Sequence, residues 1–419
     1  MTYKRRVSAL TRNLRPEYPP LVWGKGSWVR DVQGKRFLDG AAQTFNLNLG
    51  HRHPAILSAV EKQLQKIDYA SSRYGEPTML ALAEELVRAA PKGLSRVNLR
   101  MTGGSEATEC AIKSVRVATG RSTIAAAHAS FFGETLEAMR ISGNYPESAL
   151  IFPRTGAAHL RAGPCFDAWS NEDQCTGDCS EPFERLIEKS DDVAAVFVEP
   201  VNVNAGVIFP EKRCLQALRT ATRRNKTALV FDEVQTTFGW TGSMTASHYF
   251  GVTPDILTAG KALAGGFPLG AALLHPRFDV LRYGEHEFTH GGTPVTCAAA
   301  LATLEVLRGE GFLNKVVEKG NRFRAALDSI PISSGRIKVR AIGLVAGIDF
   351  ISRRGRPQPA VAARVARECR ARGLLVRVSD VGPRAAVILK PPLTTSERDL
   401  ARMTDIVTDS VKGVLSLLT

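Results

Sequence analysis

Residues 96–115 read RVNLRMTGGSEATECAIKSV, and this stretch decides the fold. The apolar run Arg96 to Met101 predicts a strand that stops at the turn Thr102-Gly103-Gly104-Ser105. A helix is expected directly after the turn, because Glu106 stands in its first turn and small or apolar residues recur at helical spacing. A strand that leads through a glycine turn into an amphipathic helix is the building unit of a parallel sheet.

The same alternation continues outward along the chain. Glu211 to Arg224 has the pattern of an amphipathic helix between two short apolar runs. The further predicted strands are Thr123 to His128, Ala194 to Val198, Ala228 to Phe231, Ile256 to Thr258 and Leu269 to His275. The prediction is therefore an α/β protein with a large doubly wound, mostly parallel sheet of six or seven strands.

Both chain ends predict a smaller α+β domain. Val22 to Leu38 alternates glycine with β-forming residues and predicts hairpins. Beyond the sheet we expect helices near Thr296 to Arg308, near Phe312 to Leu327 and from Ser396, and strands near Ile337 to Phe350, Leu374 to Val378 and Ala386 to Leu389. The expected division is 1–52 and 311–419 for the small domain and 53–310 for the large one. Residues Thr155 to Ser180 predict a long surface loop.

Composition excludes several classes of protein. The 419 residues include 55 basic and 41 acidic side chains, a net charge of +14. The basic residues are scattered without an aromatic-interleaved motif, which favours a solvated surface over a nucleic-acid site. No stretch approaches the roughly 18 apolar residues of a membrane-spanning helix. The basic amino terminus lacks an apolar secretion segment, so the expected location is cytoplasmic.

The seven cysteines predict neither disulfides nor a metal site. Four of them (Cys110, Cys214, Cys297 and Cys369) stand singly in apolar patterns, where a free cysteine acts as a small hydrophobe. The other three (Cys165, Cys175 and Cys179) have spacings that match no standard zinc or iron–sulfur pattern. We therefore expect no resident metal.

Three features carry chemistry. The turn at Gly103-Gly104 leads into helix amides that attract a phosphate, although such turns are also common without a ligand. Asp232 follows the strand run Leu229-Val230-Phe231, at the sheet edge where open α/β proteins bind ligands, although a helix cap is an alternative role. Lys261 lies among small and apolar residues, where desolvation lowers an ammonium pKa, although most lysines reach solvent instead.

Together these features suit pyridoxal phosphate, which needs a phosphate anchor, an acid beside its ring nitrogen and an amine that forms an imine. With six motifs in order, the chain resembles the class III (omega) aminotransferases of the fold-type I pyridoxal-phosphate enzymes from about Pro20 to its end. The motifs are GKGSWVRDVQGKRFLDG with LGHRHP, GGSEATECAIKSVRVATGR, EPVNVNAG, DEVQTTFGWTG, LTAGKALAGGFPLGA and THGGTPVTCAAALATLEVL.

The resemblance implies roles for individual residues. Lys261 is expected to form the Schiff base and Asp232 to pair with the pyridine nitrogen. The other expected cofactor-binding residues are Gly104 and Ser105 at the phosphate, Phe131 and Val234 on the two ring faces, Gln235 at the ring hydroxyl, Glu199 of EPVNVNAG, and Thr289. Thr289 is expected to reach the phosphate of the neighbouring subunit, which implies a homodimer with shared sites.

Three substrate positions depart from the family pattern. Glu134 stands where members acting on ornithine or 4-aminobutyrate carry an arginine, and Asn204 and Ile388 replace their glutamate–arginine pair. Ornithine and 4-aminobutyrate are therefore not the expected substrates, and an amine, a diamine or a carrier-linked substrate is favoured. Alternatively, Glu134 points away from the site and pairs with an arginine such as Arg140. Candidate carboxylate anchors for an oxo-acid partner are Arg73, Arg377 and Arg384.

The predicted function is amino-group transfer between an amine or amino acid and an aldehyde or oxo acid. An aminomutase or a lyase would use the same cofactor residues, so sequence leaves both open. A non-catalytic pyridoxal-phosphate-binding protein is disfavoured, because Lys261 and Asp232 are both present and no DNA-binding domain is recognisable.

Overall fold

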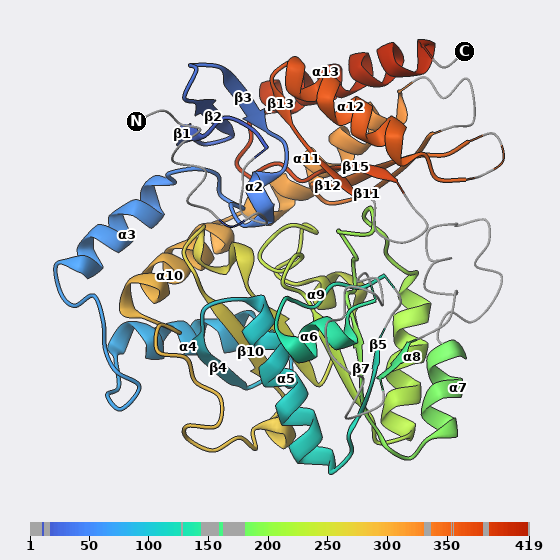
Figure 1. Cartoon of the computed structure of the whole chain (residues 1–419). Helices are drawn as coiled ribbons and strands as arrows, with labels where there is room; N and C mark the ends of the chain where they lie inside the picture. The colour runs from blue at the N-terminus through green and yellow to red at the C-terminus, as the bar shows by residue number, and fades with distance from the viewer. Residues whose placement is uncertain are drawn as a thin grey trace.

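A seven-stranded sheet forms the core of the larger, lower part of the molecule in Figure 1. The structure is a computed structural model that describes residues 11, 17–126, 129–143, 159–161, 181–330, 337–352, 354, 356–379 and 385–417. The strand order is β4-β10-β9-β8-β7-β5-β6. The bounds are β4 Arg96–Met101, β5 Thr123–Ala126, β6 His159–Arg161, β7 Val193–Val198, β8 Ala228–Asp232, β9 Ile256–Ala259 and β10 Gly270–Leu274. β10 runs antiparallel to both neighbours and the pairs from β9 to β6 are parallel, so the predicted mostly parallel sheet is confirmed.

Helices cover both faces of this sheet because alternate residues of each strand point to opposite sides. In β8, Val230 shares a core cluster with Ala111 and Val115 of α5 (Gly104–Thr119). Leu229 and Phe231 belong to another cluster, which contains Leu215 and Leu218 of α8 (Lys212–Arg224). The remaining helices of this part are α3 Pro54–Leu64, α4 Pro77–Ala89, α6 Leu136–Ile141, α7 Glu181–Lys189, α9 Ala246–Phe250 and α10 Pro294–Arg308. The sheet is therefore enclosed, as doubly wound folds require.

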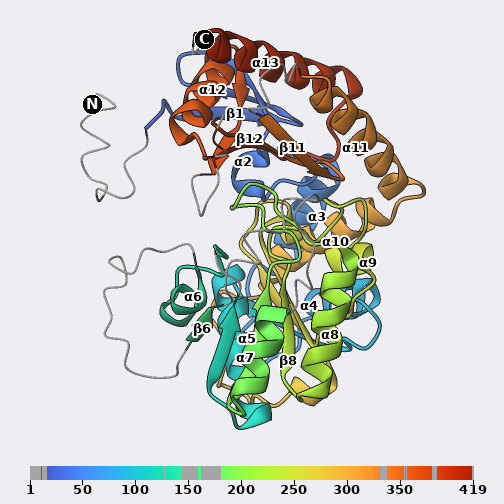
Figure 2. The same ribbon diagram turned by 90° about the vertical axis from the view of Figure 1, so that its right-hand side faces the viewer.

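The two chain ends form two further four-stranded sheets and meet in the first of them. β1 (Leu21–Lys25), β2 (Trp28–Asp31) and β3 (Arg36–Asp39) form an antiparallel meander, and β3 pairs in parallel with β13 (Leu374–Leu375). Figures 1 and 2 show these blue strands beside the red carboxyl-terminal helices. The second sheet has the order β11-β12-β15-β14. Its bounds and those of its helices are β11 Ile337–Ile342, β12 Val345–Phe350, β14 Arg377–Ser379, β15 Ala386–Leu389, α11 Phe312–Asp328, α12 Pro359–Ala371 and α13 Glu397–Ser416.

Two sequence predictions need correction. The single strand expected from Leu374 to Val378 is two strands, because β13 bonds to β3 while β14 bonds to β15 of the other sheet. Within the loop expected from Thr155 to Ser180, β6 forms an edge strand beside β5. In both cases a strand pairs with one that is distant in the sequence, so no local pattern predicts the arrangement. Cys165, Cys175 and Cys179 lie outside the described residues, whereas Cys110, Cys214, Cys297 and Cys369 are buried, as predicted.

Domain limits at 52/53 and 310/311 stay a prediction. Across the part of the chain that the structure describes, none of the helices has the length and apolar character needed to cross a membrane.

Candidate active site

A cavity of about 350 Å³ opens at the carboxyl ends of β8 and β9 and at the start of α5. It is lined by residues from distant segments: Thr44, Asn46, 102–105, 131–133, Asp232, Val234, Gln235, Lys261 and 266–269. The structure thus brings together all three features that the sequence singled out. Among the expected cofactor residues, Gly104, Ser105, Phe131, Val234 and Gln235 line the same cavity.

The glycine turn places the start of α5 at the cavity wall. Gly103 has extended backbone and Gly104 is the first residue of the helix. A Cβ on Gly104 would lie 2.7 Å from Cγ1 of Val234, so a side chain at this position would collide with Val234. The Ser105 hydroxyl accepts a hydrogen bond from the Glu134 N–H at 3.1 Å. The first amides of α5 therefore face the cavity with the positive end of the helix dipole, as an anion requires.

Lys261 follows β9 and lines the cavity. Its backbone has a φ of 40°, a left-handed conformation that is strained for a residue with a side chain. Desolvation by burial lowers the pKa of Lys261, and the carboxylates of Asp232 and Glu199 oppose this shift. A larger fraction of unprotonated amine at neutral pH follows, and this form is the nucleophile.

Asp232 and Glu233 end β8 in different roles. The Asp232 carboxylate accepts the Val234 N–H at 2.9 Å, and burial raises its pKa to about 6. Glu233 faces the other way and caps α9, accepting the Ser247 N–H at 2.8 Å. Burial raises the pKa of Glu233 to about 7. The capping role considered for Asp232 thus belongs to Glu233, which leaves the carboxylate of Asp232 in the cavity wall.

Glu199 contacts the backbone of Phe131. It follows β7 and accepts the Phe131 N–H at 2.9 Å. Its carboxyl is buried, and desolvation together with the neighbouring charge of Asp232 raises its pKa well above the usual range. The described lining residues of the cavity do not include Glu199, so its contact fixes the position of the aromatic residue that does line it.

The residues present fit pyridoxal phosphate. Both side-chain amide atoms of Gln235 are buried without a hydrogen-bond partner and belong to the cavity wall. A buried amide without a partner costs about 1–3 kcal/mol, which a polar ligand would offset. A cation beside Asp232 and an anion at the start of α5 would satisfy the two charged ends of the cavity.

The expected substrate residues are dispersed. Glu134 is exposed. Arg140, considered above as a partner of Glu134, forms an ion pair with Glu137 at 2.5 Å. The carbonyl of Asn204 accepts the hydroxyl of Ser379, and Ile388 is buried in β15. Arg73 and Thr289 are exposed and are not among the described residues that line this chain's cavity. Arg384 lies outside the described residues.

Sequence reasoning missed Lys390. Its ammonium is fully buried, donates to the Gln235 carbonyl, and lies 4.1 Å from the ring centroid of Trp240. Burial and the nearby Lys261 lower the pKa of Lys390 well below its usual range. The only local signal was its place directly before Pro391-Pro392, and that signal does not predict burial.

Comparison with known proteins decides the family. The family model described as aminotransferase class-III matches residues 14–411. The chain belongs to the class III aminotransferases. Members of this family use pyridoxal phosphate, and the cofactor of this aminotransferase is the one that its cavity fits.

Curated relatives of this aminotransferase carry related names. The acetylornithine aminotransferase of Methanothermobacter thermautotrophicus is 35% identical over 334 residues, which cover 79% of this chain and 80% of the relative. The 5-aminovalerate aminotransferase of Pseudomonas aeruginosa is 32% identical over 381 residues, which cover 89% of each. Both names describe amino-group transfer, which agrees with the predicted class of reaction.

Solved transaminases share the whole fold. A PMP-bound aminotransferase from Vibrio fluvialis superposes with a TM-score of 0.89 at 25% identity and covers 99% of both chains. An omega-aminotransferase from Paracoccus denitrificans gives the same TM-score and identity over 100% of both chains. The expected fold-type I transferase architecture is therefore confirmed.

Proposed function

We propose that this enzyme moves an amino group from an amine or amino acid to an aldehyde or oxo acid, with Lys261 as its covalent and proton-transferring residue. The observation that carries the proposal is the position of Lys261 in one cavity with Asp232 and the start of α5. Pyridoxal phosphate supplies the carbonyl carbon and the electron sink for the exchange. Nζ of Lys261, whose pKa is lowered by burial, would take up a proton from the substrate carbon and deliver it to a second carbon in a 1,3-proton shift.

The remaining cavity residues would hold the cofactor. Gly104 and Ser105 would bind its phosphate through the helix amides, and Phe131 and Val234 would contact its ring. Gln235 would donate to the ring hydroxyl, which would satisfy its buried amide. The carboxylate of Asp232 would keep the ring nitrogen protonated, and Glu199 would hold Phe131 in place.

A homodimer with shared sites is part of the proposal. Thr289 belongs to a surface loop with Tyr283, 67% exposed, and Phe288, 36% exposed. The Tyr283 hydroxyl is 3.1 Å from the Ser72 hydroxyl, and Tyr74 of that neighbouring segment is 71% exposed. Exposed aromatic side chains gathered on two touching loops are typical of an interface. In a dimer formed through these loops, Thr289 of one subunit would lie near the phosphate site of the other subunit.

The proposed donor is an amine, a diamine or a carrier-linked amine rather than free ornithine or 4-aminobutyrate. Glu134 supplies no cation beside Ser105, and Ile388 leaves an apolar side chain where an arginine would hold a carboxylate. The two relatives are named for substrates that bear a carboxylate. This enzyme would need a cation at another position to bind such a substrate. A cytoplasmic location also belongs to the proposal; among the described residues, four cysteines are free and buried.

A half-reaction screen tests the function. The holoenzyme is mixed with single amines and amino acids, and conversion of the cofactor to its amine form is followed by absorbance. If the enzyme transfers amino groups, a donor should convert the cofactor to its amine form and an oxo acid should reverse that conversion. A lyase would release ammonia or phosphate without an oxo acid, an aminomutase would isomerise its substrate, and a non-catalytic binder would show no conversion.

Borohydride trapping tests Lys261. Reduction followed by peptide mapping should place the cofactor on Lys261. Lys261→Ala should lose turnover while keeping some cofactor through the phosphate and ring contacts, and Lys315→Ala, on the exposed side of α11, should behave as wild type. Reduced cofactor found on Lys390 or on any other lysine would contradict the assignment.

A further inference from the structure

Lys390 joins three segments that are far apart in the sequence. It follows β15, and its backbone N–H donates to the Gly40 carbonyl, directly after β3, at 2.7 Å. Its Nζ donates to the carbonyl of Gln235 in the loop after β8. The carboxyl-terminal strand and the amino-terminal segment are thereby both connected, through one side chain, to a residue that lines the cavity.

Two aromatic rings surround the buried amine of Lys390. Its Nζ lies 4.1 Å from the ring centroid of Trp240 and 4.9 Å from that of Phe45, within the range of a cation–π contact. Among the described residues, Lys390 forms no ion pair with a carboxylate. A buried amine without a countercharge is costly, and an apolar side chain of similar volume would fill the space without that cost. This cost favours a role for the hydrogen bond to Gln235 rather than for packing alone.

The peptide group between Gln235 and Thr236 is held at both ends. Its N–H, from Thr236, donates to the Glu233 carbonyl at 3.0 Å, and its carbonyl accepts from Lys390. These two contacts fix the direction in which the Gln235 side chain leaves the backbone. Both polar atoms of that side chain are buried without a partner among the described residues, so they are available to a polar group of a ligand.

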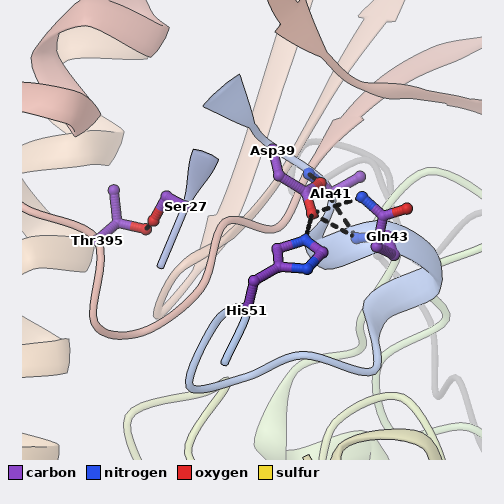
Figure 3. A network of polar contacts seen from close by, with 6 residues as sticks. All are labelled: Ser27, Asp39, Ala41, Gln43, His51 and Thr395. Atoms are coloured by element: carbon purple, nitrogen blue, oxygen red, sulfur yellow. Dashed lines mark hydrogen bonds and ion pairs between the residues drawn. The ribbon is translucent and has the colours of Figure 1, made fainter. Parts of the chain in front are cut away.

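Asp39 fixes the turn that carries Phe45. Figure 3 shows its carboxylate accepting hydrogen bonds from the backbone and side-chain amides of Gln43, the latter at 2.8 Å. His51 Nε2 lies 3.1 Å from the same carboxylate. Phe45 has a φ of 65°, so the turn α2 (Ala42–Phe45) needs such support to keep a left-handed backbone. The ring beside the buried amine is thereby held in place before cofactor or substrate binds.

We propose that Lys390 is a positioning residue of the reaction, which holds the Gln235 backbone so that the Gln235 amide meets the ring hydroxyl of the cofactor. The proposal rests on the proposed function, in which Gln235 binds that hydroxyl, and adds the residue on which its placement depends. Lys390 is not among the described residues that line the cavity, so it acts on the cofactor through Gln235. Hydrogen bonds to the ring tune the cofactor, so a misplaced amide changes its absorbance and slows the reaction with every substrate alike.

A double-mutant cycle on the holoenzyme tests the proposal. Lys390→Met keeps a long side chain against both rings and removes the donor. It should raise the dissociation constant of pyridoxal phosphate about 5- to 10-fold and shift the absorbance maximum of the bound cofactor. Gln235→Ala should cause the same two changes. The variant with both substitutions should bind the cofactor no more weakly than Gln235→Ala, because the two changes remove one shared interaction.

Lys319→Met is the matched control. Lys319 is a half-buried lysine whose Nζ donates to the carbonyls of Leu393 and Thr395, at 3.1 and 2.8 Å, and it is not among the described residues that contact Gln235. This variant should lower the free energy of unfolding and leave the absorbance and affinity of the cofactor unchanged. Lys390→Gln keeps an N–H donor, should lie between wild type and Lys390→Met, and replaces Lys390→Met in the cycle where that variant yields no folded protein.

Half-reactions separate the placement of the cofactor from substrate binding. In Lys390→Met, the rate at saturation should fall by the same factor for every donor, and the donor concentration that gives half of that rate should stay unchanged. Equal cofactor affinity and absorbance in wild type and Lys390→Met overturn the proposal, as do losses that multiply in the variant with both substitutions. Cofactor changes that depend on Lys390 only when Gln235 is present, in a protein that converts no donor, would support this role and reject the proposed function.

Discussion

The Glu199 carboxylate accepts the backbone N–H of Phe131 at 2.9 Å, and this contact joins the end of β7 to the wall of the cavity. Desolvation and the neighbouring charge of Asp232 raise the pKa of Glu199 well above its usual range, because both disfavour the charged carboxylate. A neutral amide should then replace it with little loss. Glu199→Gln is expected to keep cofactor affinity, whereas Glu199→Ala should lose about 1–3 kcal/mol of stability from an unpaired amide and a cavity.

Chemical denaturation and cofactor titration check this expectation. Each variant is the control for the other, because Glu199→Gln can still accept the hydrogen bond from Phe131 and Glu199→Ala cannot. Equal stability of Glu199→Gln and Glu199→Ala would show that the contact does not support the cavity wall.

Asp232→Asn is expected to lower the turnover number about 100-fold or more while the fold is kept, because an amide cannot hold the ring nitrogen of the cofactor protonated. A variant with near-native turnover would remove Asp232 from the catalytic residues. Glu233→Gln is the comparison variant, since the Glu233 carboxylate caps α9 and should affect stability more than the turnover of the folded enzyme.

The raised pKa of Asp232 also predicts how the stability of the cofactor-free protein depends on pH. Burial raises its pKa from 3.8 to about 6, so the folded state holds a proton that the unfolded chain has lost. The contribution of Asp232 to the free energy of unfolding is therefore largest below about pH 4. It falls by roughly 3 kcal/mol at most as the pH rises towards 6. Unfolding at several pH values should show a shallower fall in Asp232→Asn, and adding cofactor should reduce the fall in wild type. An identical slope in both proteins would contradict the prediction.

Thr289→Ala is expected to raise the dissociation constant of the cofactor about tenfold, because one hydrogen bond to the partner's phosphate would be lost. Dilution that separates the subunits should release cofactor in parallel. Equilibrium dialysis with sedimentation measures both quantities, and Thr220→Ala on the exposed face of α8 is the control. A monomer with full cofactor affinity would exclude the shared site.

Glu134→Arg is expected to improve kcat/KM for 4-aminobutyrate and ornithine relative to a diamine. The Glu134 amide bonds to Ser105 at the cavity, so a cation introduced here is placed to meet the far carboxylate of a free ω-amino acid. The gain should be about tenfold or more if the side chain turns inward. Arg140→Gln, which removes the neighbouring ion pair with Glu137, serves as a control for general effects on α6. Efficient turnover of 4-aminobutyrate by the unaltered enzyme would refute this account of specificity.

The sequence by itself determined the sheet and the centre of the site. Apolar runs and helical periodicity predicted the strands from β4 to β10 apart from β6, because both patterns arise from residues adjacent in the chain. Gly104, Asp232 and Lys261 were predictable because each stands at the end of a strand or the start of the following helix. In a parallel sheet, these places meet at one edge whatever the details of packing.

Only the tertiary structure decided which other charges surround that site. Glu199 contacts Phe131, Lys390 contacts the Gln235 carbonyl, and Arg377 stands opposite Ile388. Each contact depends on the register and packing of segments far apart in the chain, which no local pattern encodes. The exposure of Thr289 was equally hidden, because it results from how a long loop lies on the finished surface. Burial then determined the chemistry, since desolvation in the folded molecule lowers the pKa of Lys261 and raises that of Asp232.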